Sequence, residues 1–261
     1  MECLMNSSTI LDFSQVTLRF GGVTALEDVS FRVESGELFA IIGPNGAGKT
    51  SIFNCINGVY KPQTGSVLFE GRELIGERPV NVARQGVGRT FQNLGLFMNL
   101  DLIDNLLLGR HLQMKTGFFS GALWWGRAKT EELNNRQKIE TIIDLLELQP
   151  YRYQPVGLLP YGIQKRVELG RALAMEPRIL LLDEPVAGMN LEETEDMARY
   201  ILEINNELGV SILLVEHDMA MVMDIADRVM ALDFGQTIAT GSPKDVQNNP
   251  RVIAAYLGEA S

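Results

Sequence analysis

A glycine-rich segment that contains one lysine is the part of this sequence best suited to chemistry. It fits the pattern G-x-x-x-x-G-K-[ST]. Glycines allow backbone N–H groups to surround phosphate oxygens, because no side chain obstructs the approach. In this pattern Lys49 reaches the β- and γ-phosphates and the hydroxyl of Thr50 binds Mg²⁺. The sequence therefore predicts a nucleoside triphosphate site formed by Gly43, Pro44, Asn45, Gly46, Ala47, Gly48, Lys49, Thr50 and Ser51.

Two adjacent carboxylates, Asp183 and Glu184, suit the second half of such a site. They directly follow the apolar run Ile179–Leu182, and ligands of open α/β folds bind at the carboxyl ends of strands. We expect Asp183 to hold the Mg²⁺ shell and Glu184 to polarise the attacking water as a general base. An isolated Asp-Glu pair is more often a solvated strand end, so this prediction depends on the phosphate-binding segment in the same chain.

The segments that flank these residues predict an α/β core. Leu38–Ile42 is wholly apolar, as expected for a parallel strand buried on both faces, and Ile212–Val215 is similar. Residues Ser51–Ile56 carry apolar side chains at helical spacing, and Gly58 fits the end of that helix. Strand, glycine loop and helix, in this order, are the context that a phosphate-binding loop requires.

The N-terminal residues 10–36 predict antiparallel β-structure. Val29, Phe31 and Val33 alternate with polar residues, which is typical of a strand with one buried face. Residues 65–71 predict a further short strand between glycine turns.

Helices are expected in the middle of the chain and towards its end. One apolar stripe between residues 100 and 155 consists of Ile139, Ile142, Ile143 and Leu146. Asn190 and Glu193 form a capping pair that predicts a helix up to residue 208. The Ser-Pro and Asn-Pro pairs at 242–243 and 249–250 each place a cap residue before a proline, which predicts two short helices.

Composition excludes several classes of protein. The 261 residues carry 23 Lys and Arg against 33 Asp and Glu, a net charge of −10, which disfavours sequence-independent binding to nucleic acid. The only cysteines are Cys3 and Cys55, so a reducing cytosol is favoured over a disulfide-forming compartment. The sequence shows neither an apolar run of membrane-spanning length nor a secretion signal at its start, so we expect a cytoplasmic protein.

Beyond these residues, the order of several further motifs resembles the ATP-binding cassette (ABC) ATPases. Gln92, in Thr90–Asn93, matches the family's Q-loop, and His217, in Val215–Asp218, matches its switch histidine. Residues Leu159–Arg166 stand in the place of the signature loop, and Ala187–Asn190 in that of the D-loop. Phe20 matches the aromatic residue that stacks on adenine. Taken alone, each of these residues is more often structural than functional, and only their order in the chain favours the functional interpretation.

This resemblance implies an ATPase that uses ATP with Mg²⁺. The resemblance implies catalytic roles for Gln92 and His217 in addition to Glu184. It also implies that Gln92 binds the metal together with Thr50 and Asp183. Tyr161 and Gly162 would bind the nucleotide of the other subunit in a dimer. We therefore expect an α/β fold: a P-loop NTPase (RecA-like) core with an antiparallel β subdomain and an inserted α-helical subdomain.

One ABC ATPase domain is expected to span residues 9–261. Within it, residues 9–95 and 166–240 would form the nucleotide-binding core with its β subdomain. Residues 96–165 would form the helical subdomain, and residues 241–261 a C-terminal helical tail.

Two positions depart from the family pattern. Pro160 stands where the signature loop usually has serine, and proline offers neither a hydroxyl nor an N–H group. Asn190 replaces the usual aspartate of the D-loop, which keeps a hydrogen-bonding side chain without the charge. Both departures concern the strength of the composite site and leave the phosphate loop, Asp183 and Glu184 unaffected.

Within this family, the chain resembles the larger ATPase of branched-chain amino acid importers. The matching stretches are residues 88–92, 108–111, the insert 116–129 and the ending 248–258. This resemblance implies a second ABC ATPase subunit, in a hetero- or homodimer, two membrane permease subunits and, indirectly, a periplasmic substrate-binding protein. It also implies a cytoplasmic protein that is peripheral on the inner face of the cell membrane.

Several alternatives remain open at this stage. An importer for urea, short amides or aromatic acids would carry the same motifs, because substrate contacts lie in other subunits. A soluble, non-transport ABC ATPase is less favoured, since such proteins generally have two cassettes or long inserts and basic surfaces. A P-loop kinase would need an acceptor site in place of the signature helix. The aromatic-rich insert 117–126 is either a docking surface for permeases or packing under the helical subdomain.

Overall fold

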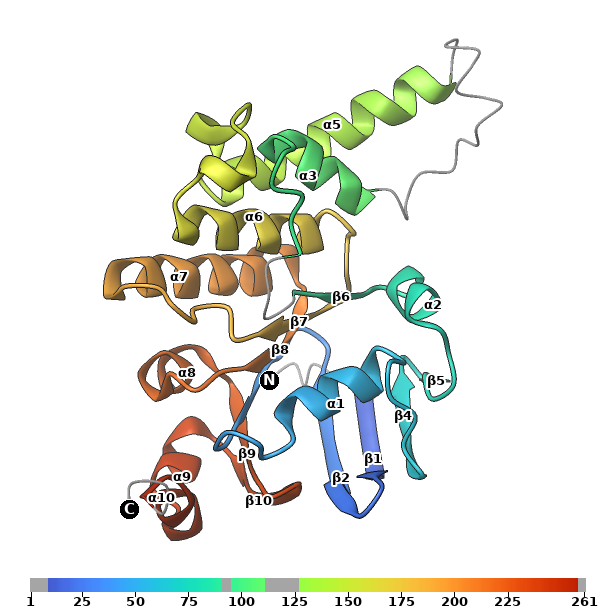
Figure 1. Ribbon diagram of the computed structural model, residues 1–261, viewed down its shortest axis with the longest axis vertical. Helices are drawn as coiled ribbons and strands as arrows, with labels where there is room; N and C mark the ends of the chain where they lie inside the picture. The colour runs from blue at the N-terminus through green and yellow to red at the C-terminus, as the bar shows by residue number, and fades with distance from the viewer. Residues whose placement is uncertain (1–8, 91–94, 111–126, 258–261) are drawn as a thin grey trace, which may run out of the picture.

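The computed structural model describes residues 9–90, 95–110 and 127–257, and these residues form two β-sheets and a set of helices (Figure 1). The antiparallel sheet has the strand order β2-β1-β4-β5, and the larger sheet has the order β10-β9-β3-β8-β7-β6. The strands of the antiparallel sheet are β1 (Thr9–Phe20), β2 (Val23–Glu34), β4 (Thr64–Phe69) and β5 (Arg72–Glu73). Those of the larger sheet are β3 (Leu38–Ile42), β6 (Val87–Arg89), β7 (Ile179–Asp183), β8 (Ser211–Val215), β9 (Arg228–Asp233) and β10 (Gln236–Gly241).

The helices include those expected from the sequence, together with others that it did not predict. They are α1 (Lys49–Ile56), α2 (Pro79–Arg84), α3 (Leu102–Gly109), α5 (Arg127–Leu145), α6 (Tyr161–Leu173), α7 (Leu191–Leu208), α8 (Met219–Ile225), α9 (Pro243–Gln247) and α10 (Pro250–Leu257), with the short 3-10 helices η2 (Gln149–Tyr151) and η3 (Val156–Leu158). Within the described ranges, no helix has the length and apolar character needed to cross a bilayer.

The larger sheet is buried on both faces. Strands β9, β3, β8, β7 and β6 run parallel, and every residue of β3, β7 and β8 is buried. Because side chains alternate along a strand, Leu38, Ala40 and Ile42 belong to one hydrophobic core, whereas Phe39 and Ile41 belong to the other. The two wholly apolar runs predicted as buried parallel strands are therefore confirmed.

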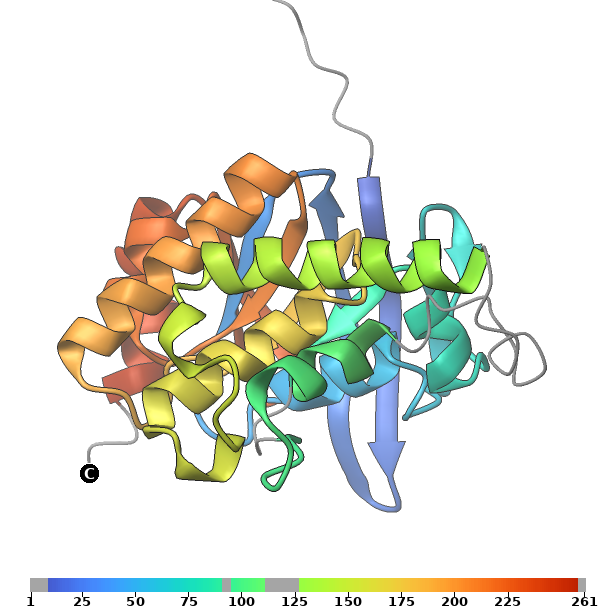
Figure 2. The ribbon, with the colours of Figure 1, turned by 90° about the horizontal axis from the view of Figure 1, so that it is seen from above.

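One of the two cores lies under a layer of helices. Figure 2, a view onto this layer, shows α3, α5, α6 and α7 next to one another above the strands. The predicted stripe of Ile139, Ile142, Ile143 and Leu146 is buried in this core, so its assignment to a packed helix face is confirmed. Residues of the insert 117–126, and also His111, lie outside the described residues.

The other core lies between the two sheets and includes α1. Strands β1 and β2 pair antiparallel, with Phe13 opposite Phe31. The ring of Phe31 stacks on Phe13 with centroids 5.0 Å apart and on Phe39 of β3 at 5.4 Å. Stacked aromatic pairs add to the energy of burial, so this row of rings joins the antiparallel sheet to the larger one. The predicted β-structure of residues 10–36 is confirmed.

The predicted helix caps are also present. Asn190 and Glu193 form a reciprocal capping box at the start of α7, with both hydrogen bonds at 3.0 Å. The Ser242 hydroxyl accepts the N–H of Asp245 at the start of α9, and Asn249 accepts the N–H of Arg251 in α10. Each cap satisfies an N–H group that has no partner within its helix.

Candidate active site

Three strands of the larger sheet end in line at the same edge. Ile41 of β3 and Asp183 of β7 are both in register with Val215 of β8, which lies between these strands. Beyond these strand ends lie Gly43 after β3, Glu184 after β7, and Glu216 followed by His217 after β8. The carboxyl edge of a parallel sheet is where α/β proteins bind ligands. The fold therefore brings the phosphate-binding segment, the acidic pair and His217 to one edge, as the sequence predicted.

Two glycines give the phosphate-binding loop its shape. A Cβ atom on Gly43 would lie 2.1 Å from the carbonyl oxygen of Leu232, and one on Gly48 would lie 2.6 Å from that of Ala25. These contacts are far too short for a side chain, so only glycine allows the loop to pack against the neighbouring backbone. The loop is also held by the N–H of Gly235, which donates to the Ala47 carbonyl oxygen at 2.9 Å.

Helix α1 begins at Lys49, two residues before the apolar pattern suggested. Gly48 is its N-cap, and no side chain caps this end. The N–H groups of the first turn have no partner within a helix, and together with the helix dipole they form a site that suits an anion. The side chain of Thr50 is exposed at this end, whereas Ser51 is half-buried.

The Lys49 side chain is buried in the loop that it is expected to serve. Its Nζ atom donates to the carbonyl oxygens of Gly43 and Pro44, at 2.5 and 2.9 Å. Only 7% of the residue is exposed. Buried charges need hydrogen-bonding partners, and here the loop's own carbonyl groups supply them. The phosphate-binding segment itself therefore holds the ammonium group in place.

Asp183 is held by an arginine from the neighbouring strand. Arg89, the last residue of β6, contacts the Asp183 carboxylate at 2.9 Å and donates to the Asn54 side chain of α1 at 2.8 Å. Burial raises the pKa of the Asp183 carboxyl, and the Arg89 guanidinium opposes this shift. Charge-assisted hydrogen bonds are stronger than neutral ones, so Arg89 fixes the position of Asp183 relative to the helix of the phosphate loop.

Glu184 has an uncommon backbone conformation. Its φ angle is 50°, in the left-handed region, and its N–H donates to the Val215 carbonyl oxygen at 2.8 Å. Non-glycine residues rarely adopt positive φ angles, and those that do are concentrated at functional sites. At this turn Glu184 is half-buried and directly follows the strand that carries Asp183.

The donor atoms at this edge suit Mg²⁺. The Thr50 hydroxyl and the Asp183 carboxylate are hard oxygen ligands, the type that Mg²⁺ prefers. Among the described residues, no cluster of three or more His, Cys, Asp or Glu side chains forms an all-protein metal cage. Few protein ligands are typical of a Mg²⁺ ion that takes its other oxygens from phosphates and water.

Of three other predicted site residues, two are exposed and one lies outside the described residues. Phe20 lies at the end of β1, is 47% exposed, and contacts the Tyr60 ring edge-on at 5.0 Å. An exposed ring at this position remains available for stacking. His217 has 59% of its side chain exposed. Gln92 lies outside the described residues.

Tyr161 and Gly162 lie on the opposite face of the sheet from the phosphate-loop helix. Helix α6, which begins at Tyr161, packs in the core under the helical layer, whereas α1 packs in the core between the sheets. Pro160 is the N-cap of α6. A Cβ on Gly162 would lie 2.4 Å from the Glu193 carboxylate, so this loop packs on the start of α7. The chain therefore does not unite its signature-like loop with its own phosphate loop.

Two residues of the site were not predicted from the sequence. Arg89 connects Asp183 to α1, and Glu216, which is fully buried, accepts N–H groups of the loops after β7 and β8. For Glu216 the sequence does hold a signal, because a carboxylate directly after four buried apolar residues needs a specific partner. Nothing in the sequence pairs Arg89 with Asp183, since these residues are far apart in the chain.

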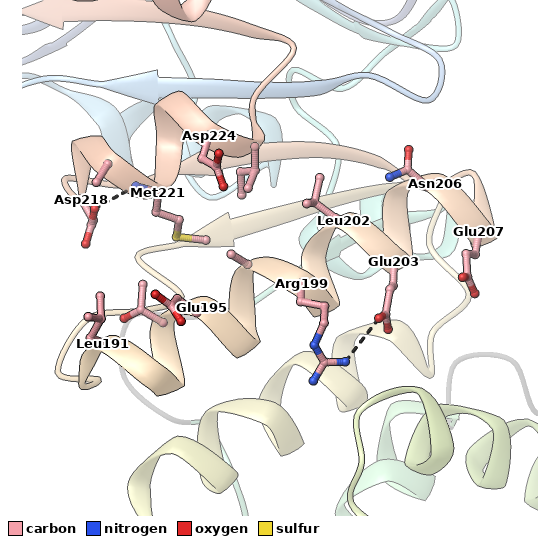
Figure 3. Close-up of a pocket in the computed structure, with 14 residues that line it drawn as sticks. Leu191, Glu195, Arg199, Leu202, Glu203, Asn206, Glu207, Asp218, Met221 and Asp224 are labelled. Carbon is pink, nitrogen blue, oxygen red and sulfur yellow. Dashed lines mark hydrogen bonds and ion pairs between the residues drawn. The ribbon is translucent and has the colours of Figure 1, made fainter.

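Two hollows lie beside this edge of the sheet. A cavity of about 490 Å³ separates the outer side of the phosphate loop from α10 and the turn between β9 and β10. A groove of about 630 Å³ runs between α7 and α8 (Figure 3). Figure 3 shows Leu191 and Asp218, where these helices start, at one end of the groove and Glu207 at the other. The starts of α7 and α8 are thus neighbours beside the site.

Comparison with known protein families gives two matches along the chain. A profile of the ABC transporter family matches residues 26–187. A second profile, described as branched-chain amino acid ATP-binding cassette transporter, matches residues 236–261. The first match includes the phosphate loop and the acidic pair, and the second includes most of the C-terminal part.

Individual relatives match over nearly the whole length. The chain is 42% identical over 257 residues to the high-affinity branched-chain amino acid transport ATP-binding protein LivG of Salmonella typhimurium, covering 97% of this chain and 100% of the relative. It is 40% identical over 254 residues to BraF of Pseudomonas aeruginosa, with the same coverage. Among solved structures, an ATP-binding cassette of an ABC transporter in its ADP conformation superposes with a TM-score of 0.83 at 29% identity, covering 97% of this chain and 100% of that one.

Proposed function

The chain belongs to the ABC transporter family, and we propose that it is the ATP-hydrolysing motor subunit of an importer for branched-chain or related amino acids. The observation that carries this proposal is the alignment, at one sheet edge, of the phosphate loop after β3, the acidic pair after β7 and His217 after β8. This arrangement can bind a triphosphate and act on its terminal phosphate.

The proposed chemistry combines residues from several segments of the chain. The loop N–H groups and Lys49 bind the phosphates of ATP, and the exposed ring of Phe20 stacks on the adenine. Thr50 and Asp183, together with Gln92, would hold Mg²⁺, which neutralises charge on the phosphate oxygens.

Glu184 is the proposed general base. Its carboxylate accepts a proton from the attacking water, whose oxygen bonds to the γ-phosphorus while the bond to the β–γ bridging oxygen breaks and ADP leaves. His217 would lie beside the γ-phosphate, where its exposed imidazole can hydrogen-bond the attacking water without adding a permanent charge.

A second ATPase subunit completes the proposed site. Tyr161 and Gly162 belong to a helix on the other face of the sheet from α1, so they would serve a nucleotide bound by a partner. The partner is a second ABC ATPase, in a hetero- or homodimer. Pro160 lacks the hydroxyl that this loop usually offers, so in a heterodimer the two composite sites would be unequal.

The proposed dimer works on the inner face of the cell membrane, beneath two permease subunits that receive substrate from a periplasmic binding protein. The helical subdomain, residues 96–165, would contact the permeases, and residues 241–261 would form the tail that flanks the phosphate loop. Branched-chain amino acids are favoured as substrate by the C-terminal profile match and the near full-length relatives. Urea, short amides and aromatic acids are the alternative cargo.

Recruitment to membranes tests the transport function. We expect the untagged chain to sediment with membranes when permease and partner ATPase subunits of such an importer are co-expressed, and to remain in the supernatant when they are not. The bound fraction should hydrolyse ATP faster when reconstituted with binding protein and leucine. A chain that stays in the supernatant in both cases would contradict the transport role, while its ATPase activity would be judged separately.

Dimer formation has its own test. Because each nucleotide needs a signature loop from another subunit, we expect the isolated chain to hydrolyse ATP slowly, with turnover per chain that rises with protein concentration. Steady-state phosphate release would be measured over a hundred-fold range of concentration, alongside sedimentation velocity. Turnover that stays constant in a proven monomer would rule out the dimer.

A further inference from the structure

Glu216 is a buried carboxylate that the proposed chemistry does not use. It is 0% exposed and lies between Val215, the last residue of β8, and His217. Its carboxylate accepts three backbone N–H groups: those of Val186 at 3.0 Å, His217 at 2.8 Å and Asp218 at 3.3 Å. A buried charge is retained only where hydrogen bonds replace its hydration. This position is therefore built for a carboxylate.

The two oxygens of Glu216 serve two different loops. Oε1 accepts the N–H of Val186, which lies two residues beyond Glu184 in the loop after β7. Oε2 accepts the N–H groups of His217 and Asp218 in the loop after β8. A backbone bond from Glu184 to Val215 joins the same two loops at 2.8 Å. Glu216 is thus a cross-link between the loop of the proposed base and the loop of His217.

Glu216 also lies beside one nitrogen of the His217 ring. Oε2 is 3.6 Å from Nδ1 of His217, a contact longer than a hydrogen bond but close enough for the carboxylate charge to favour a proton on that nitrogen. A proton on Nδ1 leaves Nε2 as a hydrogen-bond acceptor, which suits the O–H of the attacking water and not a phosphate oxygen.

We propose that Glu216 is a positioning residue for ATP hydrolysis. It sets the tautomer and orientation of His217 and holds the loop of His217 at a fixed distance from Glu184, without touching the nucleotide itself. The proposal rests on the ATPase function proposed above. It requires a carboxylate, because a glutamine would turn an N–H donor towards one of the three backbone N–H groups and leave that group without an acceptor.

The replacement Glu216→Gln keeps the size of the side chain and removes one acceptor. We expect kcat to fall about 10- to 100-fold, the effect of a lost hydrogen bond to a charged group, and KM for ATP to change less than about threefold because the phosphate loop is untouched. Glu203→Gln, in which the replaced carboxylate pairs with Arg199 on α7, is the matched control and should keep wild-type kcat. A kcat within twofold of wild type in folded Glu216→Gln would overturn the proposal.

A second measurement separates positioning from simple stabilisation. The chain has two histidines, so ¹⁵N spectra of the imidazole rings contain two sets of signals, and His217→Gln identifies the set that belongs to His217. We expect neutral His217 to carry its proton on Nδ1 in the wild type and to shift towards Nε2 in Glu216→Gln. An unchanged tautomer would overturn the assigned role, whatever the effect on stability.

A double-mutant cycle completes the test. If Glu216 acts through His217, Glu216→Gln should cost much less in a His217→Gln background than in the wild type, because coupled residues are not additive. Fully additive losses would overturn the proposal. Should Glu216→Gln fail to fold, Glu216→Asp, which keeps the charge on a shorter side chain, enters the same cycle and the same spectra. Wild-type turnover tests the ATPase function independently of these ratios.

Discussion

Replacing Glu184 with glutamine is expected to lower ATP turnover by about two to four powers of ten while ATP still binds. Glutamine has the shape of glutamate but cannot accept a proton from water, and loss of a general base typically costs a factor in this range. The backbone of residue 184 should not change, because its bond to Val215 involves the N–H group alone. ATP binding should also persist, since the phosphate loop follows β3, whereas Glu184 follows β7.

The measurement combines single-turnover phosphate release with equilibrium binding of labelled ATP. Glu207→Gln is the control, because Glu207 is an exposed carboxylate at the far end of α7. In the absence of hydrolysis, a dimer that holds two ATP molecules should also become more stable, which sedimentation would detect. If the turnover of Glu184→Gln stays within a few-fold of wild type, Glu184 is not the general base.

The local elements of the fold were predictable because short-range patterns determine them. The five apolar residues of β3, the alternation in β2 and the capping box of Asn190 and Glu193 each depend on neighbouring residues. The phosphate loop is also local, since its glycines, lysine and helix start follow one another directly. These parts of the candidate site could be located from the sequence with correct flanking structure.

The remaining features depend on contacts between segments that are distant in the chain. The ion pair of Arg89 and Asp183 joins two neighbouring strands that the sequence separates by 94 residues. The role of Glu216 depends on Val186, which β7 brings to its side from 30 residues away. No periodic pattern encodes such pairs, because they follow from strand order and register.

The placement of the signature-like loop also could not be predicted from the sequence. Sequence spacing puts Tyr161 on a helix between two parts of the core, but it does not state which face of the sheet that helix covers. The structure places α6 and α1 on opposite faces. This separation, and not the motif itself, is what makes a second subunit necessary in the proposed mechanism.

Replacing Lys49 with alanine is expected to weaken ATP binding about a hundred-fold or more, in contrast to Glu184→Gln. The change removes the ammonium that would contact the β- and γ-phosphates, and charge-assisted hydrogen bonds contribute about 1.5–3 kcal/mol each. It also leaves the carbonyl oxygens of Gly43 and Pro44, which now accept from Nζ, without their donor. The loop should therefore lose both its charge and part of its shape.

Lys49→Arg separates these two effects. Arginine keeps the charge, but its planar guanidinium is larger than the ammonium that fits among the loop carbonyls, where only 7% of Lys49 is exposed. We therefore expect Lys49→Arg also to bind ATP poorly, whereas Lys61→Ala, at an exposed site after α1, should bind like the wild type. Fluorescent ATP titrations give the affinities, and melting curves without nucleotide confirm folding. Unchanged affinity in folded Lys49→Ala would show that the loop N–H groups bind the phosphates without the lysine.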